Sequence, residues 1–336
     1  MKLDWRGALG IALSAGALWW TLHDVDLAKV WRVLSSSNLA LWIACTTAAT
    51  AIFPLRARRW AALLEPVAGR LPFSPLWQAT AVGMMMNNVA PGRAGEFARP
   101  FVLSRSEPTV KFTAAFASLA VDRLFDGVIV LLLMIVATLD PRFPHDSPAA
   151  AGVAQSMRYA ALFLAAVLVV LTTMVFAPGT LFATYDATAG RFAPTLAARI
   201  RPLLQGFASG LGVLRRPRLV IEVFVWALLH WLCNAAAFWL GFRALGIEAP
   251  LTAALFLQGI IAIGVAIPSS PGFFGFFEAA AKVGLGLYGV SETQAVSFGL
   301  GFHILSYIPI TVIGAWYLTR LNLRLSDFSG GGATAT

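Results

Sequence analysis

Six long apolar segments, separated by polar connections, dominate the pattern of the chain. They cover residues Gly7–Leu22, Asn38–Leu55, Phe112–Leu139, Met157–Ala177, Leu219–Leu240 and Gln294–Leu318. Each is long enough, or nearly long enough, for the roughly 20 helical residues that cross a bilayer. The pattern therefore predicts six transmembrane helices.

Two further apolar segments, Leu76–Ala90 and Ala253–Ile267, are too short to cross in the same way. At about 1.5 Å per residue such a helix reaches roughly 22 Å, less than the roughly 30 Å of hydrocarbon. We expect each segment to enter the membrane, turn and return as a re-entrant or broken helical hairpin. The alternative is eight complete spans, with the short helices tilted in a thinned bilayer.

Both short segments lead into the same motif, a small polar pair followed by Pro-Gly-x-x-Gly and then a carboxylate. The first copy runs from Asn87 to Glu96 and the second from Ser269 to Glu278. With 18 prolines and 29 glycines in 336 residues, composition alone gives roughly 0.1 such matches. The pair indicates an inverted repeat, with copies at about 38–139 and 219–318. Paired breaks in two halves of a membrane protein point to a transport site.

Basic residues orient these elements. They follow the second span and the first short segment, at Arg56, Arg58, Arg59, Arg70, Arg93, Arg99, Arg105 and Lys111. If the first hairpin returns, both groups lie on one side, which the positive-inside rule makes cytoplasmic. The second hairpin then enters from outside, and both termini are cytoplasmic. The expected fold is an all-α polytopic membrane protein, one integral domain over 1–325 with a disordered tail over 326–336.

Composition supports this class of protein. Hydrophobic residues make up 58% of the chain and charged residues only 12%, whereas soluble domains carry about 25% charged residues. A net charge of +9 could indicate a nucleic-acid partner, but the basic residues lie between apolar runs with no free-standing basic domain. We therefore expect no nucleic-acid partner.

The first motif carries the strongest candidate chemistry. Arg93, Glu96 and Arg99 are three residues apart, so a helix from Gly95 onward would align them as an ion ladder on one face. Backbone amides freed at Pro91-Gly92, a helix N-terminus and an arginine together suit a phosphate group. The alternative is an interface helix with ordinary surface ion pairs.

Charges also fall inside the spans. Asp122, Arg123 and Asp126 interrupt an apolar run, where charges are costly and usually face the bundle interior. They predict either a partner set for the first hairpin or a structural ion pair. Glu278 precedes Lys282 by four residues, as a proton or cation carrier or as the partner of that lysine. The predicted substrate-binding residues are Asn87, Asn88, Pro91, Gly92, Arg93, Glu96, Arg99, Arg123, Asp126, Ser270, Pro271, Gly272 and Glu278.

Several motifs of enzymes and motors are missing. The chain contains no G-x-x-x-x-G-K-[ST], no H-E-x-x-H or Cys/His cluster, and no G-x-S-x-G. We therefore expect no catalytic residues, metal or cofactor, and a protein that is not an enzyme.

The first motif, from Asn87 to Arg99, resembles the signature of the lysylphosphatidylglycerol synthase transmembrane family, also called flippase-like domain proteins. Three other segments support the likeness: Arg59-Trp60, Val121–Asp126 and Ile267–Gly272. The resemblance spans roughly residues 5 to 325. It implies a multi-pass protein of the bacterial inner membrane, and a stand-alone member because no synthase domain follows before Thr336.

In the best-understood members of that family, the multiple peptide resistance factors, this domain moves aminoacylated phosphatidylglycerol between leaflets. The resemblance implies a flippase or transporter for a phospholipid or other lipid-linked anionic headgroup. Its expected partners are the membrane lipid and a lipid-biosynthesis enzyme. The alternatives are an intramembrane lipid-modifying enzyme and an accessory scaffold of a lipid or cell-envelope pathway.

Overall fold

The structure is a computed structural model that describes residues 5–90, 93–145, 148–198, 200–201, 211–265 and 270–328. Within these ranges every regular element is helical, which confirms the all-α prediction. The elements are α1 (Trp5–Leu22), α2 (Leu27–Ser35), α3 (Leu39–Ala68), α4 (Phe73–Val89), α5 (Gly95–Ser106), α6 (Phe112–Thr138), α7 (Pro148–Phe176), α8 (Pro178–Phe192), η1 (Leu211–Arg215), α10 (Pro217–Ala244), α11 (Leu251–Gly264), η2 (Pro271–Phe273), α12 (Phe276–Gly286), α13 (Glu292–Arg320) and η3 (Leu325–Phe328).

Four of the described helices are long and apolar enough to cross a membrane: Leu39–Ala68, Ala154–Phe176, Pro217–Ala244 and Glu292–Arg320. The helix α6 has comparable length, 27 residues, but carries three charged residues near its middle. Together with the 18-residue α1, these helices occupy all six predicted spans. The chain is a polytopic helical membrane protein.

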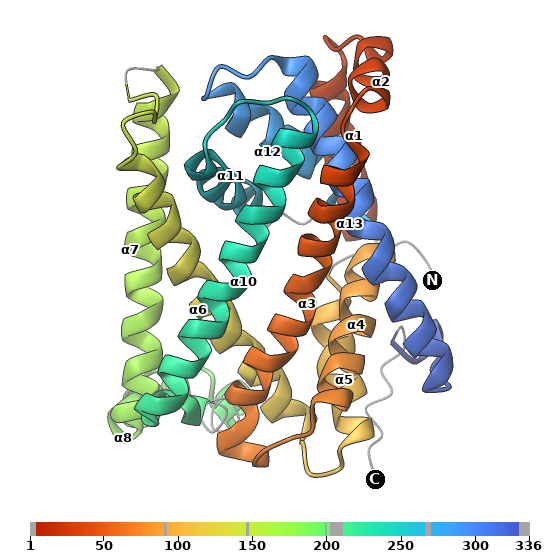
Figure 1. Cartoon of the computed structure of the whole chain (residues 1–336). Helices are drawn as coiled ribbons and strands as arrows, with labels where there is room; N and C mark the ends of the chain where they lie inside the picture. The colour runs from red at the N-terminus through yellow and green to blue at the C-terminus, as the bar shows by residue number, and fades with distance from the viewer. Residues whose placement is uncertain are drawn as a thin grey trace.

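The two short segments form helical hairpins, as predicted. The first pairs α4 with α5 and the second pairs α11 with α12. In Figure 1 the first hairpin occupies the lower half of the molecule and the second lies in the upper half. Both therefore return to the end from which they start, which contradicts the alternative of eight complete spans.

We call the lower end in Figure 1 the basic end, because it holds the connections after α3, after α5 and before α10, each of which carries basic residues. The chain enters the first hairpin from this end and the second from the opposite end. The helices α3 to α6 have 30, 17, 12 and 27 residues, and α10 to α13 have 28, 14, 11 and 29. This order matches the expected duplication, whose exact bounds stay a prediction.

Glycine lets the helices of the first hairpin approach closely. A Cβ atom on Gly95 would lie 1.9 Å from the carbonyl oxygen of Gly83, and one on Gly83 would lie 2.8 Å from the Arg99 Cβ. Real side chains cannot occupy such positions, so both glycines are required where α4 crosses α5. This crossing sets the position of Arg99 in the bundle.

The tips of the two hairpins share an unusual backbone conformation. Arg93 has a φ of 55° and Phe273 a φ of 63°, and these residues occupy the same position after Pro-Gly in the two motifs. A positive φ costs a bulky residue on the order of 1–3 kcal/mol. The repeat is therefore visible in the backbone as well as in the sequence.

The expected tail over 326–336 begins inside η3, so helical structure reaches Phe328. The rest of that tail lies outside the described residues.

Candidate functional site

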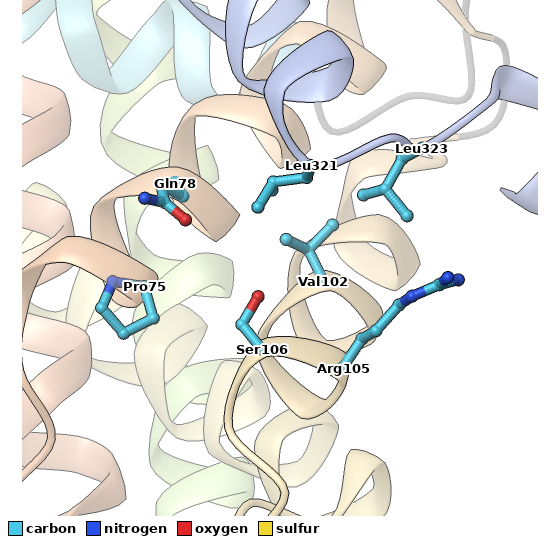
Figure 2. A pocket seen from close by; sticks show the side chains of 7 residues that line it. All are labelled: Pro75, Gln78, Val102, Arg105, Ser106, Leu321 and Leu323. Atoms are coloured by element: carbon cyan, nitrogen blue, oxygen red, sulfur yellow. The ribbon is translucent and has the colours of Figure 1, made fainter.

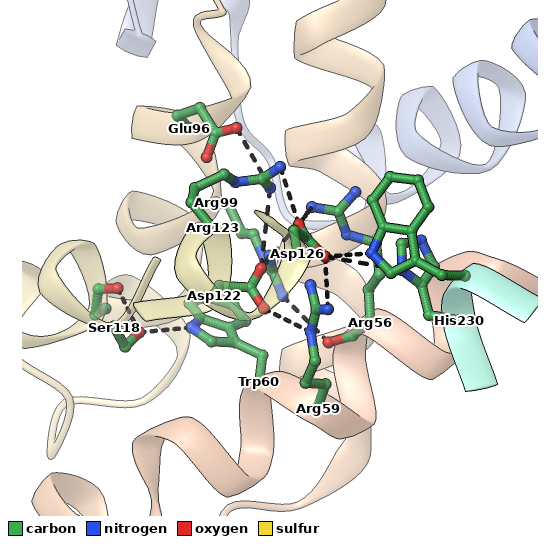
Figure 3. Close-up of polar contacts among 12 residues, drawn as sticks. Arg56, Arg59, Trp60, Glu96, Arg99, Ser118, Asp122, Arg123, Asp126 and His230 are labelled. Carbon is green, nitrogen blue, oxygen red and sulfur yellow. Dashed lines mark hydrogen bonds and ion pairs between the residues drawn. The ribbon is translucent and has the colours of Figure 1, made fainter. Parts of the chain in front are cut away.

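Four arginines and three carboxylates from three helices meet beside the first turns of α5 in the first hairpin (Figure 3). They are Arg56 and Arg59 of α3, Glu96 and Arg99 of α5, and Asp122, Arg123 and Asp126 of α6. We call this group the arginine cluster. The three helices are otherwise largely apolar. Charged side chains on such helices usually face the interior of the bundle and pair with one another there.

Arg59 is the centre of the cluster. Its Nε lies 2.6 Å from Asp122 Oδ1 and its Nη1 lies 2.7 Å from Asp126 Oδ1. Both Arg59 and Asp122 are fully buried. One guanidinium thus bridges two carboxylates that are one helical turn apart, and this fixes α3 against α6.

The other three arginines make longer contacts. Arg99 Nη1 lies 3.5 Å from Asp122 Oδ2, and Arg123 Nη1 lies 3.3 Å from Asp126 Oδ2. Arg56 Nη2 lies 3.8 Å from Asp122 Oδ2. At these separations the charges still attract strongly in a low-dielectric interior, but the hydrogen-bonding capacity of the arginines is not used up.

Positive charge is in excess within the cluster, by four guanidinium groups to three carboxylates. Several buried nitrogens, among them Arg56 Nε, Arg99 Nε and Arg123 Nε, have no hydrogen-bond acceptor among the described residues. Unpaired buried donors are costly. The arrangement is therefore suited to bind an anion, for which guanidinium groups are the preferred protein partner.

Two tryptophans form part of the walls of the cluster. The guanidinium carbon of Arg99 lies 4.0 Å from the ring centroid of Trp60, a cation–π contact. Trp60 Nε1 donates to Ser118 Oγ at 2.8 Å, which holds the ring in place. Trp231 of α10 donates from Nε1 to Asp126 Oδ1 at 2.9 Å. Access differs within the cluster: the Arg123 side chain is 39% exposed, whereas that of Arg99 is 1% exposed.

The tips of the two hairpins contact each other through Arg93. Arg93 Nη2 donates to the carbonyl oxygen of Val265 at 2.7 Å, and its guanidinium lies 5.6 Å from the ring centroid of Phe273. The two residues with positive φ are thus neighbours. The repeated motifs form one junction at the centre of the protein.

The end of α4 also joins the second half of the chain. Asn88 Nδ2 donates to Thr311 Oγ1 at 2.7 Å, and Tyr307 donates from its hydroxyl to the Asn88 carbonyl at 3.2 Å. Asn87 Oδ1 accepts from the Gly95 N–H at 2.9 Å, which closes the turn of its own hairpin. The two asparagines therefore have structural contacts at the junction.

A second buried polar group lies at the tip of the second hairpin. His303 of α13 places Nδ1 2.6 Å from Glu278 Oε1 and Nε2 2.7 Å from the carbonyl oxygen of Gly272. Glu278 Oε2 accepts from the Gly275 N–H at 2.7 Å. Phe274 stacks on the histidine ring with centroids 4.4 Å apart. We call Glu278, His303 and Gly272 the histidine centre.

The family model described as lysylphosphatidylglycerol synthase TM region matches residues 7–314. The chain belongs to this family. The match covers both hairpins, the arginine cluster and the histidine centre.

A curated relative of this family member is the protein named glycosyltransferase AglD from Haloferax volcanii. The two are 30% identical over 139 residues, which is 39% of this chain and 22% of the relative. The aligned region thus spans less than a quarter of the relative's length. These comparisons support a membrane protein connected with lipids.

The structure brings together four of the predicted substrate-binding residues of this family member: Glu96, Arg99, Arg123 and Asp126. Arg93 lies at the tip junction, with Asn87 and Asn88 close by. Ser270, Pro271, Gly272 and Glu278 lie at or beside the histidine centre. Pro91 and Gly92 lie outside the described residues.

Two expectations about pairing are wrong. Arg93, Glu96 and Arg99 do not form a ladder, because Arg93 precedes the helix with a positive φ and Glu96 pairs with Arg123 at 3.5 Å. Lys282 does not pair with Glu278; its ammonium lies 3.2 Å from Glu292. In both cases a contact with another helix replaces a contact along the same helix.

Arg56 and Arg59 are two members of the arginine cluster that are absent from the predicted substrate-binding residues. The second span ended at Leu55 in the prediction, so both residues were placed in a loop, whereas α3 continues to Ala68. Their spacing of three residues matches that of Arg123 and Asp126, which is the signal that could have identified them.

A pocket of about 440 Å³ opens at the basic end, between the start of α4, the end of α5 and the segment that follows α13 (Figure 2). Pro75, Gln78, Val102, Arg105, Ser106, Leu321 and Leu323 line it. It contains no member of the arginine cluster, so it is a separate feature of the surface.

Proposed function

We propose that this protein moves an anionic lipid, such as a phospholipid or another lipid with a phosphate headgroup, between the leaflets of the bacterial inner membrane. The observation that carries the proposal is the excess of buried guanidinium groups in the arginine cluster. A phosphate diester has one negative charge and oxygen acceptors that match the unused donors of Arg99, Arg56 and Arg123.

The two hairpins supply the means of transport in this proposal. Each enters from one end of the bundle and reaches the centre, so each can close the headgroup site from one side. Inverted repeats with broken helices commonly bind substrate near the bilayer midplane and expose it alternately. The headgroup would contact Arg123, the accessible arginine, while the acyl chains stay in lipid.

Reconstitution into liposomes tests this function. Leaflet exchange of fluorescent phosphatidylglycerol is measured with and without protein, with phosphatidylcholine as the zwitterionic comparison. We expect Arg123→Gln to slow exchange by about tenfold, the effect of one lost charge-assisted contact. Arg58→Gln is the matched control, because Arg58 lies on the exposed face of the same α3 helix, over Phe73.

Two outcomes would contradict the proposed transport. Exchange no faster than in empty vesicles, across several anionic lipids, would reject a transport function. Variants that lose cellular function only when their abundance falls would support a scaffold instead.

A second candidate function is the modification of a lipid phosphate within the membrane. The relative from Haloferax volcanii is named a glycosyltransferase, which favours this candidate. Against it, Asp122 and Asp126 are both held by guanidinium groups and are poorly placed to act as acid, base or metal ligand. Formation of a new lipid product by the purified protein in detergent would support this candidate over transport.

A further inference from the structure

The two short contacts of His303 in the histidine centre require two hydrogen atoms, one for each contact. A carbonyl oxygen can only accept, so His303 Nε2 must carry the hydrogen that it donates to Gly272. Between Nδ1 and Glu278 Oε1, 2.6 Å apart, one further hydrogen is required, on either atom. The pair therefore holds one shared proton, as imidazolium with carboxylate or as imidazole with carboxylic acid.

Loss of that proton breaks one of the two contacts. If the remaining hydrogen stays on Nε2, two acceptors face each other across the short contact with Glu278. If it moves to Nδ1, the lone pair of Nε2 faces the carbonyl oxygen of Gly272. Glu278 is fully buried and His303 is 6% exposed, so water does not readily replace the missing partner.

The contact with Gly272 holds a strained turn. Gly272 has a φ of 71° and Phe273 a φ of 63°, and no helical hydrogen-bond ladder supports a segment this short. The tip is held by the histidine, by Phe274 stacked on the same ring, and by the Ser270 N–H, which donates to Ser14 Oγ of α1 at 2.8 Å. A weakened His303 contact removes a main restraint on this turn.

Within the part of the chain that the structure describes, few other titratable groups face the centre. On α13, Tyr307 lies 6.5 Å from His303 between ring centroids. Lys282 of α12 is engaged by Glu292 and Trp20. The helices α1 and α4 contribute the uncharged Ser14 and Asn88 to this junction. From the first hairpin, Arg93 reaches the tip through Val265 and Phe273.

We propose that Glu278 and His303 form a proton-dependent latch that holds the tip of the second hairpin against α13. With the shared proton bound, the tip is closed over the junction with Arg93. Without it, the tip is released and the centre of the protein opens toward the end from which the second hairpin enters. The link to lipid movement rests on the proposed function, whereas the latch itself does not.

Amide hydrogen exchange of the full chain in lipid nanodiscs tests the latch without any transport. The reporter is the peptide over 270–276, whose amides at Ser270, Phe273 and Gly275 are hydrogen-bonded. After correction for the intrinsic rate, we expect exchange in the wild type to be about tenfold faster at the alkaline end of the pH range in which the protein stays folded than at the acidic end.

Glu278→Gln provides the critical variant. Its amide can accept from Gly275 and donate to Nδ1 of the neutral His303 ring, so it copies the protonated state and should stay protected at the alkaline pH at which the wild type opens. Glu65→Gln, at a carboxylate that faces Arg70, is the matched control and should respond to pH as the wild type does. A pH-independent wild type, or an equal pH response in Glu278→Gln, would overturn the latch.

A second measurement on the wild type alone covers the case in which Glu278→Gln does not fold. The chain has four histidines, so ¹⁵N-histidine NMR can follow each ring. We expect the ¹⁵N chemical shifts of the His303 ring to change over the same pH range in which the tip becomes unprotected, because the shared proton leaves either Nδ1 or the Glu278 carboxyl that faces it. A ring that keeps one state while the tip opens would contradict the proposal. Because neither readout needs lipid movement, failure of leaflet exchange and failure of the latch are distinguishable.

Discussion

The two hairpins present the same turn to the centre of the protein, but their side chains differ in kind. At the first hairpin, guanidinium groups outnumber carboxylates and several donors have no acceptor among the described residues. At the second, Glu278 and His303 are both buried and have hydrogen-bond partners at 2.6–2.7 Å. A duplicated backbone can thus carry a charged site in one copy and a nearly neutral one in the other.

The two centres also differ in how far their hydrogen bonds are satisfied within the chain. Spare donors in the arginine cluster leave room for an anion that is not part of the chain. Saturated hydrogen bonds at the histidine centre instead fix the chain to itself. The comparison therefore separates a site suited to binding from a site suited to closing, and mutations can test each part of that division.

The largest expected effect follows from removing the central arginine. Arg59→Met leaves Asp122 and Asp126 buried without their closest cation, which should cost about 3–5 kcal/mol in the free energy of unfolding. Denaturant titration in detergent measures it, with Arg58→Met on the exposed face of α3 as the control. A cost below about 1 kcal/mol would mean that the cluster does not depend on Arg59.

The second prediction removes hydrogen bonds from the histidine centre. His303→Phe keeps a ring against Phe274 and Phe277 but leaves Glu278 Oε1 and the Gly272 carbonyl without their histidine partner. We expect a loss of about 2–3 kcal/mol in the same unfolding titration. Adding Glu278→Gln should recover part of it, as measured by a double-mutant cycle. Strict additivity would show that the pair does not act as one unit.

The third prediction concerns affinity rather than stability. Glu96 lies 3.5 Å from Arg123 and competes with any anion for that guanidinium. Glu96→Gln should therefore tighten binding of inorganic phosphate by about two- to fivefold, the usual strength of an exposed pair. The rise of Tm with phosphate concentration reports it. Glu65→Gln should leave the affinity unchanged, and weaker binding in Glu96→Gln would assign that glutamate a direct role in binding.

Hydrophobic length and charge placement were sufficient to predict the long helices and both hairpins. The reason is physical: the bilayer fixes the length of a span, and the segments 76–90 and 253–267 fall short of it. The end of α3 could not be read in this way. Beyond Leu55 the helix leaves the apolar run, yet it continues because Trp60, Leu63 and Leu64 pack in the interior of the protein.

The pairing of charges was the least predictable part of the candidate site. Spacing along one helix indicates which residues share a face, but it does not say what the next helix brings to that face. Glu278 faces α13 and finds His303, while Lys282 turns to Glu292. The pairing of Arg59 with Asp122 depends on how α3 lies against α6. Contacts between helices decide such pairs, and one sequence holds no direct signal for them.

The smallest expected effect comes from a contact outside both centres. Asp140, in the connection after α6, accepts from Arg142 and Thr252, and these hydrogen bonds hold the pKa of its carboxyl below the ordinary value. Such a group stabilises the fold above about pH 3.9, and its contribution is lost as the pH falls through the lowered pKa. Asp140→Asn should therefore lower Tm slightly at neutral pH and flatten the acid limb of the Tm–pH curve. Phosphate affinity and the pH response of the 270–276 peptide should both stay as in the wild type. A change in either would show that the contact between Asp140 and Thr252 of α11 is coupled to the hairpin tips. Asp140→Asn could then not serve as a control for the division between a binding site and a closing site.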